Sequence, residues 1–324
     1  MSFSFVIPLR RCWRKPWITS LRMLKHFVAA SVMCSVLGFS SQCWSSVEFR
    51  SERALVVDEA TGEVLLDKNA STAAPIASVT KLMTIMVVLD GNQDPDEVLT
   101  IERADVDRRE SIRTCLPVGS KLPRSAMVTL ALLASDNHAA AALARSYEGG
   151  RTAFDAAMQQ KIADLELTST TIDEPTGLSP LNAASPQDLV KVLSAARDYP
   201  EIAASTSQAS QQLVVNGRER NFKNTNGLGG MPGWDILMSK TGTTLAAGRC
   251  LAMRVQSAGR TVLVVLMGAV GKSTRVFDAM NVRRFLSGEE QLSEPIRVAS
   301  SVRMLGQHRH PSHTRGGAKT RRSA

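Results

Sequence analysis

Histidine is scarce in this chain, and the scarcity excludes two kinds of hydrolase. Only five of the 324 residues are histidines, and His138 is the only one between residues 27 and 307. A Ser-His-Asp triad would have to use His138, which we interpret instead as a helix-start residue that lines a cleft. No H-E-x-x-H sequence is present to bind a catalytic zinc ion. The remaining histidines of the C-terminal tail, His308, His310 and His313, are expected to be solvated, so the sequence predicts no metal and no organic cofactor.

Long apolar runs are also lacking, which argues against a conventional membrane span. The N-terminal run from Phe27 to Phe39 is too short to cross a bilayer comfortably. It follows six lysines and arginines, a pattern typical of a Sec signal peptide. We therefore predict a signal peptide over residues 1–45, with Met23 as an alternative true start, and export to the periplasm. An uncleaved leader that associates the protein with the membrane is the alternative.

Cysteine is rare enough that no disulfide framework is predicted. Of the five cysteines, Cys12 and Cys34 fall in the predicted leader. Cys115 and Cys250 could pair in an oxidising compartment or remain as buried free thiols, because the sequence does not reveal the distance between them.

The net charge of +9 comes from the two ends of the chain. Residues 1–26 hold six basic residues and residues 306–324 hold five, with no acidic residue in either segment. Subtracting these eleven from +9 leaves about −2 for the rest. A nucleic-acid-binding domain would carry its cations on the folded surface, so no nucleic acid partner is expected. The tail, residues 289–324, is basic and is expected to be disordered.

The hydrophobic patterns predict an α+β fold for the intervening segment, residues 46–288, which we take as a single catalytic domain. Strands are expected in a hairpin over residues 53–66 and, after strand-like alternation begins at Leu213, over 236–242, 249–255 and 261–266. Helices are expected over residues 78–89, 124–134, 138–147, 152–165, 186–197 and 273–286. Strands at both ends with helices between them indicate an antiparallel sheet flanked by helices, with a mostly helical insert.

The first chemistry-bearing motif is Ser78-Val79-Thr80-Lys81. Serine and lysine three residues apart share one helix face, where the lysine amine can take the hydroxyl proton. The segment after Ser78 is apolar almost all round, so the helix is expected to be buried. Desolvation beside another cation lowers a lysine pKa, which a lysine base requires. The helix start also favours developing negative charge near Ser78. The motif alone is weak, and its alternative interpretation is an exposed helix start.

Two further clusters strengthen the prediction of a serine hydrolase. Ser135-Asp136-Asn137 puts a hydroxyl and an amide at a break between helices, where they can relay a proton and hold a substrate amide. Lys240-Thr241-Gly242 ends a predicted strand; its cation and hydroxyl suit a carboxylate, and its glycine allows a ligand to lie against the strand edge. Each motif occurs once, in the order S-x-x-K, S-x-N, K-T-G.

With these three motifs the chain resembles the penicillin-recognising serine enzymes. The segments Pro75–Thr84, Glu174–Ser179 and Ser239–Gly242 with Ala247–Cys250 are similar to the low-molecular-mass penicillin-binding D-alanyl-D-alanine peptidases, especially their endopeptidase branch. The resemblance spans roughly residues 48–286 and implies the serine β-lactamase/DD-peptidase-like fold. It also implies peptidoglycan stem peptides and cross-links as substrates and β-lactams as covalent inhibitors.

Particular residues acquire roles through this resemblance. It implies Ser78 as the acylated nucleophile, Lys81 as its base and Ser135 as a proton relay. The substrate-binding groups it implies are Asn137, Lys240, Thr241, Gly242, Thr243 and Arg275. The N–H groups of Ser78 and Thr243 would form the oxyanion hole. Arg275 matches a carboxylate-binding arginine of relatives only loosely, and the alternative is an exposed helix-start arginine.

Other functions stay open at this point. A D-alanyl-D-alanine carboxypeptidase is the first, although only about forty residues follow the last catalytic element, which favours the endopeptidase branch. A class A β-lactamase is the second; Glu174-Pro175 resembles its deacylation loop superficially, but Leu178 stands where asparagine is expected. A sensor that is acylated by β-lactams without turnover is the third.

Overall fold

The sheet that carries the third motif is built from both ends of the chain. The computed structural model describes residues 49–107, 114–271 and 273–288; the predicted leader and tail lie outside these ranges. Five antiparallel strands run in the order β2-β1-β11-β10-β9. They comprise β1 (Arg53–Asp58), β2 (Val64–Lys68), β9 (Asp235–Thr244), β10 (Gly248–Ser257) and β11 (Arg260–Ala269). Residues 54–57 pair with residues 263–266, which joins the N-terminal hairpin to the C-terminal strands as the sequence predicts.

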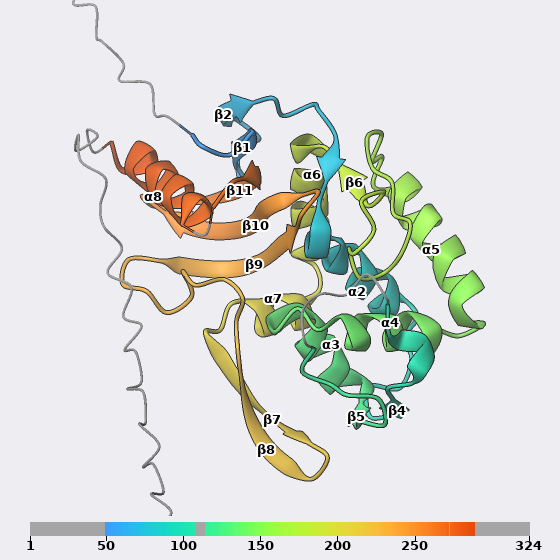
Figure 1. Cartoon of the computed structure of the whole chain (residues 1–324). Coiled ribbons are helices and arrows are strands. Elements are labelled where there is room, and N and C mark those ends of the chain that lie inside the picture. Colours follow the sequence, from blue (N-terminus) through green and yellow to red (C-terminus); the bar gives the residue numbers. More distant parts are fainter. Residues whose placement is uncertain (1–48, 108–113, 272, 289–324) are drawn as a thin grey trace, which may run out of the picture. The chain divides into compact units, whose positions relative to one another are not determined.

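The helices form two groups (Figure 1). The helical region holds α2 (Thr80–Asp90), α3 (Arg124–Leu133), α4 (Asn137–Arg145), α5 (Gly150–Asp164) and α7 (Pro200–Thr206). The helices that pack on the sheet are α6 (Pro186–Ala196), against β1, β10 and β11, and α8 (Thr274–Ser287), against β10 and β11. The α+β architecture predicted from the sequence is therefore confirmed. No helix within the described ranges has the length and apolarity needed to cross a membrane.

Short two-stranded pairs lie outside the five-stranded sheet. They are β3 (Ala74–Pro75) with β6 (Ala183–Ala184), β4 (Val98–Thr100) with β5 (Lys121–Pro123), and β7 (Ser210–Val215) with β8 (Arg218–Lys223). The alternation that begins at Leu213 thus belongs to a separate hairpin, which Figure 1 shows projecting below the sheet. The turn residues Asn216 and Gly217 both have positive φ, as a tight hairpin turn requires.

Helix α2 lies at the centre of the helical region, and its burial on all sides accounts for its apolar composition. Nine of its eleven residues are buried, including Met83, Ile85 and Met86. It contacts α3, α4, α5 and α6, so no face is left for water and no amphipathic pattern is needed. The buried helix predicted over residues 78–89 is confirmed, except that it begins at Thr80, after a 3₁₀ turn η1 (Ala77–Val79).

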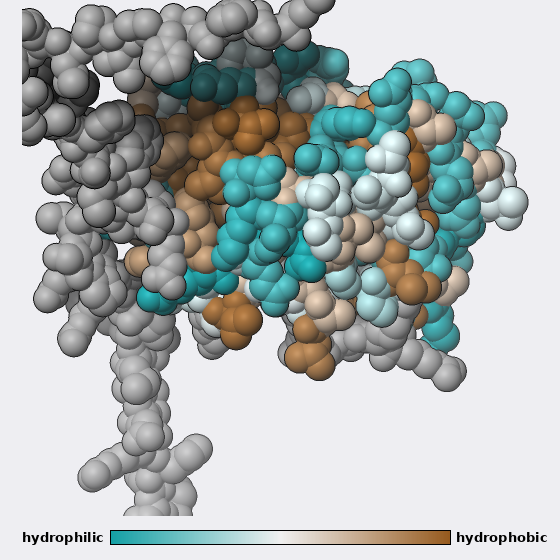
Figure 2. Space-filling view, turned by 90° about the horizontal axis from the view of Figure 1, so that it is seen from above, coloured by the Kyte–Doolittle hydropathy of each residue, from teal (hydrophilic) through white to brown (hydrophobic). Residues whose placement is uncertain are grey.

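The surface seen from above mixes both kinds of residue (Figure 2). Hydrophilic and hydrophobic areas lie side by side on that face, as on most folded proteins. Some large apolar side chains are strongly exposed, among them Leu181 and Leu245.

Candidate functional site

Ser78 is presented by a strained turn at the start of α2. The preceding residue, Ala77, has φ +47°, a left-handed conformation that costs a non-glycine residue about 1 kcal/mol or more. Ser78 itself is half-exposed, although Ile76, Ala77 and Val79 around it are buried. The turn therefore brings one hydroxyl to the surface of an otherwise apolar core.

Lys81 lies one helical turn further and is fully buried. Its Nζ is 3.0 Å from Ser78 Oγ, 2.7 Å from Asn137 Oδ1 and 2.6 Å from the carbonyl oxygen of Thr176. Three oxygen partners hold the amine in one place, and its side chain has 0% exposure. Ser78 Oγ thus has a nitrogen base within hydrogen-bonding distance.

The Thr176 carbonyl is fixed by a loop that the Glu174 carboxylate organises. That carboxylate accepts hydrogen bonds from the Thr176 hydroxyl at 2.5 Å and from the backbone N–H groups of Thr176, Gly177 and Ser179. Asn182 donates to it as well, at 3.1 Å. Gly177 has φ +87°, and a Cβ there would lie 2.1 Å from the Ala77 carbonyl oxygen. Only glycine therefore permits the loop to pack against the turn before α2.

Ser135, Asp136 and Asn137 occupy the break between α3 and α4, as predicted. Asp136 caps α4 by accepting from Ala139 N at 2.9 Å, and its other oxygen accepts from Cys115 N at 2.7 Å. Ser135 has φ +57°. The capped helix start directs the Asn137 side chain to Lys81. The left-handed backbone of Ser135 directs its own hydroxyl to Lys240 of β9.

Strand β9 supplies the second lysine. Lys240 Nζ lies 2.9 Å from Ser135 Oγ and 3.0 Å from the Thr241 carbonyl oxygen. Burial lowers the pKa of Lys240 well below its ordinary value, and the positive charges of Lys81 and Arg275 lower this pKa further. The site therefore disfavours the charged form of this amine relative to an exposed lysine. The neighbouring Thr241 Oγ1 donates to Thr225 Oγ1 at 2.7 Å.

The structure adds a packing reason for glycine at position 242. A Cβ at this position would lie 2.7 Å from Ile76 O and 3.0 Å from Ser78 N. The glycine therefore lets β9 pack directly against the turn before α2, in addition to any role in admitting a ligand. This close approach brings the strand that carries Thr243 next to the backbone N–H of Ser78.

A pocket of about 520 Å³ opens over these groups. Its lining includes Ser78, Ser135, Asn137, Thr241, Thr243, Arg249 and Arg275. Lys81 and Lys240 lie beneath it, both with at most 1% exposure. The structure thus brings together residues from every predicted motif. In the part of the chain that the structure describes, no group of three or more His, Cys, Asp or Glu side chains is arranged to hold a metal ion.

Arg275 is buried rather than an exposed helix-start residue. It lies in the first turn of α8 with 9% exposure, and its Nη1 donates to the Cys250 carbonyl oxygen at 3.2 Å. Burial lowers its pKa, and the nearby Arg249 charge lowers this pKa further.

The two cysteines of the domain are free thiols. Cys250 is buried with its Sγ 3.9 Å from the Pro75 carbonyl oxygen, and burial raises its pKa to about 11. Cys115 lines the pocket, and burial raises its pKa as well. His138 is buried with Nδ1 2.7 Å from the Leu116 carbonyl oxygen, and it is not among the residues that line the pocket.

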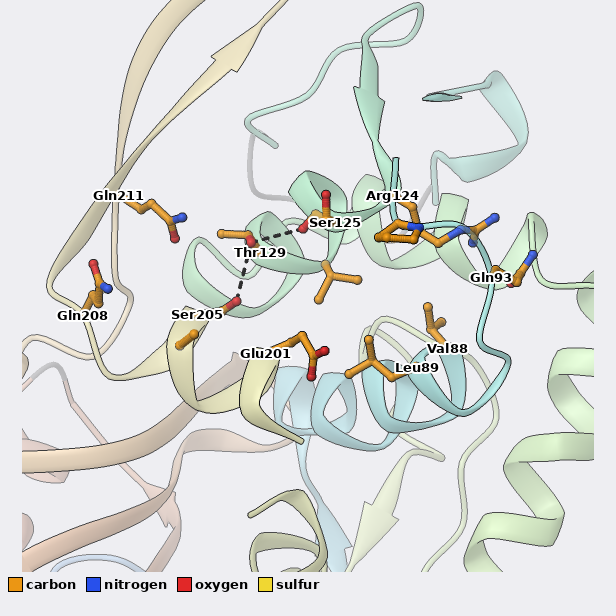
Figure 3. A pocket seen from close by; sticks show the side chains of 13 residues that line it. Val88, Leu89, Gln93, Arg124, Ser125, Thr129, Glu201, Ser205, Gln208 and Gln211 are labelled. Atoms are coloured by element: carbon orange, nitrogen blue, oxygen red, sulfur yellow. Dashed lines mark hydrogen bonds between the residues drawn. The ribbon is translucent and has the colours of Figure 1, made fainter. Parts of the chain in front are cut away.

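A second pocket, of about 290 Å³, lies between α2, α3 and α7 (Figure 3). Figure 3 shows Val88 and Leu89 pointing into it, with Ser125, Thr129 and Ser205 joined by hydrogen bonds. None of its lining residues belongs to the three motifs. The motif residues that line one of these two pockets therefore all line the first.

Sequence reasoning missed several groups that shape this site. Thr225 follows no motif, and only the folded chain brings its hydroxyl to Thr241. The contact of Lys81 with the Thr176 carbonyl oxygen could not be predicted from residue type, because every residue has a backbone carbonyl. The segment Glu174–Ser179 was nevertheless part of the family resemblance. Arg249 stood in the same resemblance without an assigned role.

Comparison with known proteins matches the chain to one family. The D-alanyl-D-alanine carboxypeptidase family matches residues 40–271. A D-alanyl-D-alanine endopeptidase of Pseudomonas aeruginosa is 42% identical over 243 residues, covering 74% of this chain and 78% of that protein. The Escherichia coli D-alanyl-D-alanine endopeptidase is 36% identical over 258 residues, covering 79% and 83%.

A solved structure agrees with this match. The Streptomyces K15 DD-transpeptidase has a TM-score of 0.68 to this chain with 26% sequence identity, covering 74% of this chain and 98% of that one. The predicted DD-peptidase-like fold is therefore confirmed. Family match, relatives and fold agree, and the chain belongs to the D-alanyl-D-alanine carboxypeptidase family of serine peptidases.

Proposed function

We propose that this protein is a serine D-alanyl-D-alanine endopeptidase, which cleaves D-alanyl cross-links in peptidoglycan through an acyl-enzyme on Ser78. The observation that carries the proposal is the 3.0 Å contact between Lys81 Nζ and Ser78 Oγ inside a buried, fully partnered amine site. Because its substrate lies outside the cytoplasmic membrane, the protein acts there, and the predicted leader supplies the export signal.

The first chemical step forms the acyl-enzyme. Ser78 Oγ attacks the carbonyl carbon of the D-alanyl peptide bond while Lys81 Nζ takes the hydroxyl proton. The backbone N–H groups of Ser78 and Thr243 stabilise the oxyanion that develops. The C–N bond then breaks, the Ser78 ester remains, and the departing nitrogen needs one proton.

The second lysine delivers that proton through Ser135. The Ser135 hydroxyl, 2.9 Å from Lys240 Nζ, donates a proton to the departing amine and is reprotonated by the lysines. A lysine with a lowered pKa exchanges protons near neutral pH more readily than an ordinary one. Water then attacks the ester carbonyl carbon and gives one proton to Lys81 Nζ. That proton passes to Ser78 Oγ as the ester bond breaks, which releases the carboxylic acid and restores the Ser78 hydroxyl.

Substrate binding uses the remaining pocket groups. Asn137 suits a backbone amide of the substrate, and Thr241 with Arg275 suits the carboxylate beside the scissile bond. Penicillin presents a similar carboxylate beside a reactive amide, so β-lactams should acylate Ser78 and inhibit the enzyme.

The β-lactamase alternative requires a glutamate that activates water. The only candidate named by the sequence, Glu174, uses its carboxylate to accept bonds from its own loop and from Asn182. It is therefore occupied as a structural group. Slow hydrolysis of the penicilloyl-enzyme is expected.

The test uses purified muropeptides. Incubation with cross-linked dimers should yield monomers, whereas release of free D-alanine from pentapeptide monomers would indicate a carboxypeptidase. Ser78→Ala should abolish both this cleavage and labelling by a fluorescent penicillin. As a control, Ser287→Ala, at the far end of α8, should retain both. Penicillin labelling that survives in Ser78→Ala would contradict the proposal, and labelling without any turnover would identify a sensor.

A further inference from the structure

The pocket carries an excess of positive charge that the proposed chemistry does not fully use. Its ionisable lining residues outside the catalytic pairs are Arg249, Arg275, Cys115 and a single acid, Asp136. The Asp136 carboxylate accepts hydrogen bonds from the N–H groups of Cys115, Leu116 and Ala139. It is therefore committed to the chain itself and leaves the arginines uncompensated.

The two arginines stand together on the wall formed by β10 and α8. Arg249 pairs with Thr243 across β9 and β10, and residues directly opposite in an antiparallel pair point to the same face. Arg275 reaches the carbonyl oxygen of Cys250, the residue next to Arg249. Both therefore lie beside the strand segment that holds the oxyanion site.

Neither arginine forms an ion pair within the ranges that the structure describes. Arg275 is 91% removed from solvent, as its 9% exposure shows, and Arg249 is half-buried. Two neighbouring like charges in a partly desolvated wall are unfavourable unless an anion joins them. One carboxylate occupies one guanidinium in a bidentate pair, so two guanidiniums suit a ligand with two acid groups.

We propose that Arg249 is a specificity-determining residue that binds a second carboxylate on the leaving group, next to the carboxylate held by Arg275. The inference rests on the proposed function. A departing D-alanine carries one carboxylate. In a cross-link, the departing amine belongs to a diamino acid within a second stem peptide, so that leaving group carries more than one. Arg249 would thus favour cross-links over terminal D-alanine.

The test compares two substrates with the full protein and its variants. The first is an N-acylated peptide ending in D-alanyl-D-alanine, and the second is a purified cross-linked stem-peptide dimer. Arg249→Gln removes the charge and Arg249→Lys keeps it without the planar fork. The matched control is Arg260→Gln at the β10–β11 turn, whose side chain is 53% exposed.

Arg249→Gln should lower kcat/KM for the dimer about ten- to hundredfold, the range of one charge-assisted contact, and for the monomer about threefold at most. Arg249→Lys should recover part of the loss, and Arg260→Gln should leave the ratio of the two values unchanged. The peptide that the dimer releases as leaving group, which carries more than one carboxylate, should bind to the Ser78→Ala protein. Adding Arg249→Gln to that protein should weaken this binding by a similar factor. This binding readout does not depend on turnover.

An equal loss for both substrates, or no loss, would overturn the inference while leaving the proposed function intact. If the unmodified protein cleaved neither substrate, the proposed function would fail first, and the inference with it.

Discussion

Two lysines, each nearly unexposed and each facing a serine hydroxyl, define this protein at the scale of single residues. Lys81 and Lys240 have exposures of 0% and 1%, and the charge on Lys81 contributes to lowering the Lys240 pKa. Burial disfavours the charged form of Lys240. The same burial that suits this amine to moving protons therefore costs folding stability while the amine is charged.

The cost at Lys240 should depend on pH in a definite direction. Its pKa is lowered in the folded state, so between that value and the ordinary lysine pKa of about 10.4 the unfolded chain binds more protons. Stability from this group therefore rises with pH across that window and is constant below and above it. Relative to Lys240→Gln, the unmodified protein should gain up to about 1.4 kcal/mol of unfolding free energy per pH unit.

Urea unfolding of both proteins from about pH 7 to about pH 10 measures this difference. Other titrating groups are shared and cancel in the comparison. Lys191→Gln, which removes an exposed lysine, should show no such trend. A difference between the unmodified protein and Lys240→Gln that stays constant with pH would refute the assignment of a lowered pKa.

At the scale of elements, the site depends on how closely β9 packs against the turn before α2. We expect Gly242→Ala to push the strand away, because its Cβ would meet backbone atoms of Ile76 and Ser78 that cannot yield easily. The cost should be about 1–3 kcal/mol of stability. Penicillin acylation should slow about ten- to a thousandfold as Thr243 N–H leaves its position.

Stopped-flow acylation and urea unfolding give both quantities for Gly242→Ala. Gly227→Ala is the matched control, because a Cβ at Gly227 meets nothing within 4 Å and its φ is not positive. Unchanged acylation in Gly242→Ala would show that the close approach is not needed.

The second prediction at this scale concerns the loop from Glu174 to Asn182, which the Glu174 carboxylate holds in place. Glu174→Gln replaces two acceptor oxygens by one acceptor and one donor, so N–H groups of the loop lose their partner. We expect a loss of about 2–4 kcal/mol and slower acylation, because the Thr176 carbonyl that holds Lys81 is no longer fixed.

Thermal unfolding and acylation rates measure these effects, with Glu148→Gln, an exposed glutamate, as control. If Glu174 activated the deacylating water instead, Glu174→Gln would slow release of the acyl group while leaving its formation and the stability intact.

At the scale of the whole molecule, the helical region and the sheet share one core. Met86 and Leu130 of the helices belong to the same buried cluster as Met238, Ala252 and Val265 of the strands. Neither part can unfold without exposing the apolar surface of the other. We therefore expect one cooperative transition.

Two probes test this expectation. Circular dichroism at helical wavelengths reports mainly on the helical region, which holds most of the helices. Fluorescence of Trp234, which packs against the cluster on the α8 side of the sheet, reports on the strands. Their urea midpoints should coincide. Separate midpoints would show that the cleft joins two independently stable parts.

Much of this molecule could be predicted from local patterns. The apolar segment after Ser78 predicted a buried helix, the cluster Ser135-Asp136-Asn137 predicted a break between two helices, and alternation at residues 249–255 and 261–266 predicted adjacent strands. The three motifs then predicted catalytic roles for Ser78, Lys81 and Ser135 through their resemblance to the penicillin-recognising serine enzymes. Boundaries differed by a few residues, because η1 and the final turns depend on packing.

Other features followed no local pattern. The sequence could not reveal that Thr176 offers a backbone carbonyl to Lys81, that Thr225 lies beside Thr241, or that Cys115 and Cys250 remain apart as free thiols. It suggested a ligand-binding reason for Gly242 but could not reveal the close approach of this glycine to the backbone of Ile76 and Ser78.

The sequence by itself determined the three motifs and which segments become helices and strands, because periodicity and motif spacing act over a few residues. Only the tertiary structure decided which of these groups meet, how dry each lysine is, and that Arg249 joins Arg275 in the pocket wall. Those contacts join residues far apart in the chain, and their energies depend on burial that no local stretch of sequence contains.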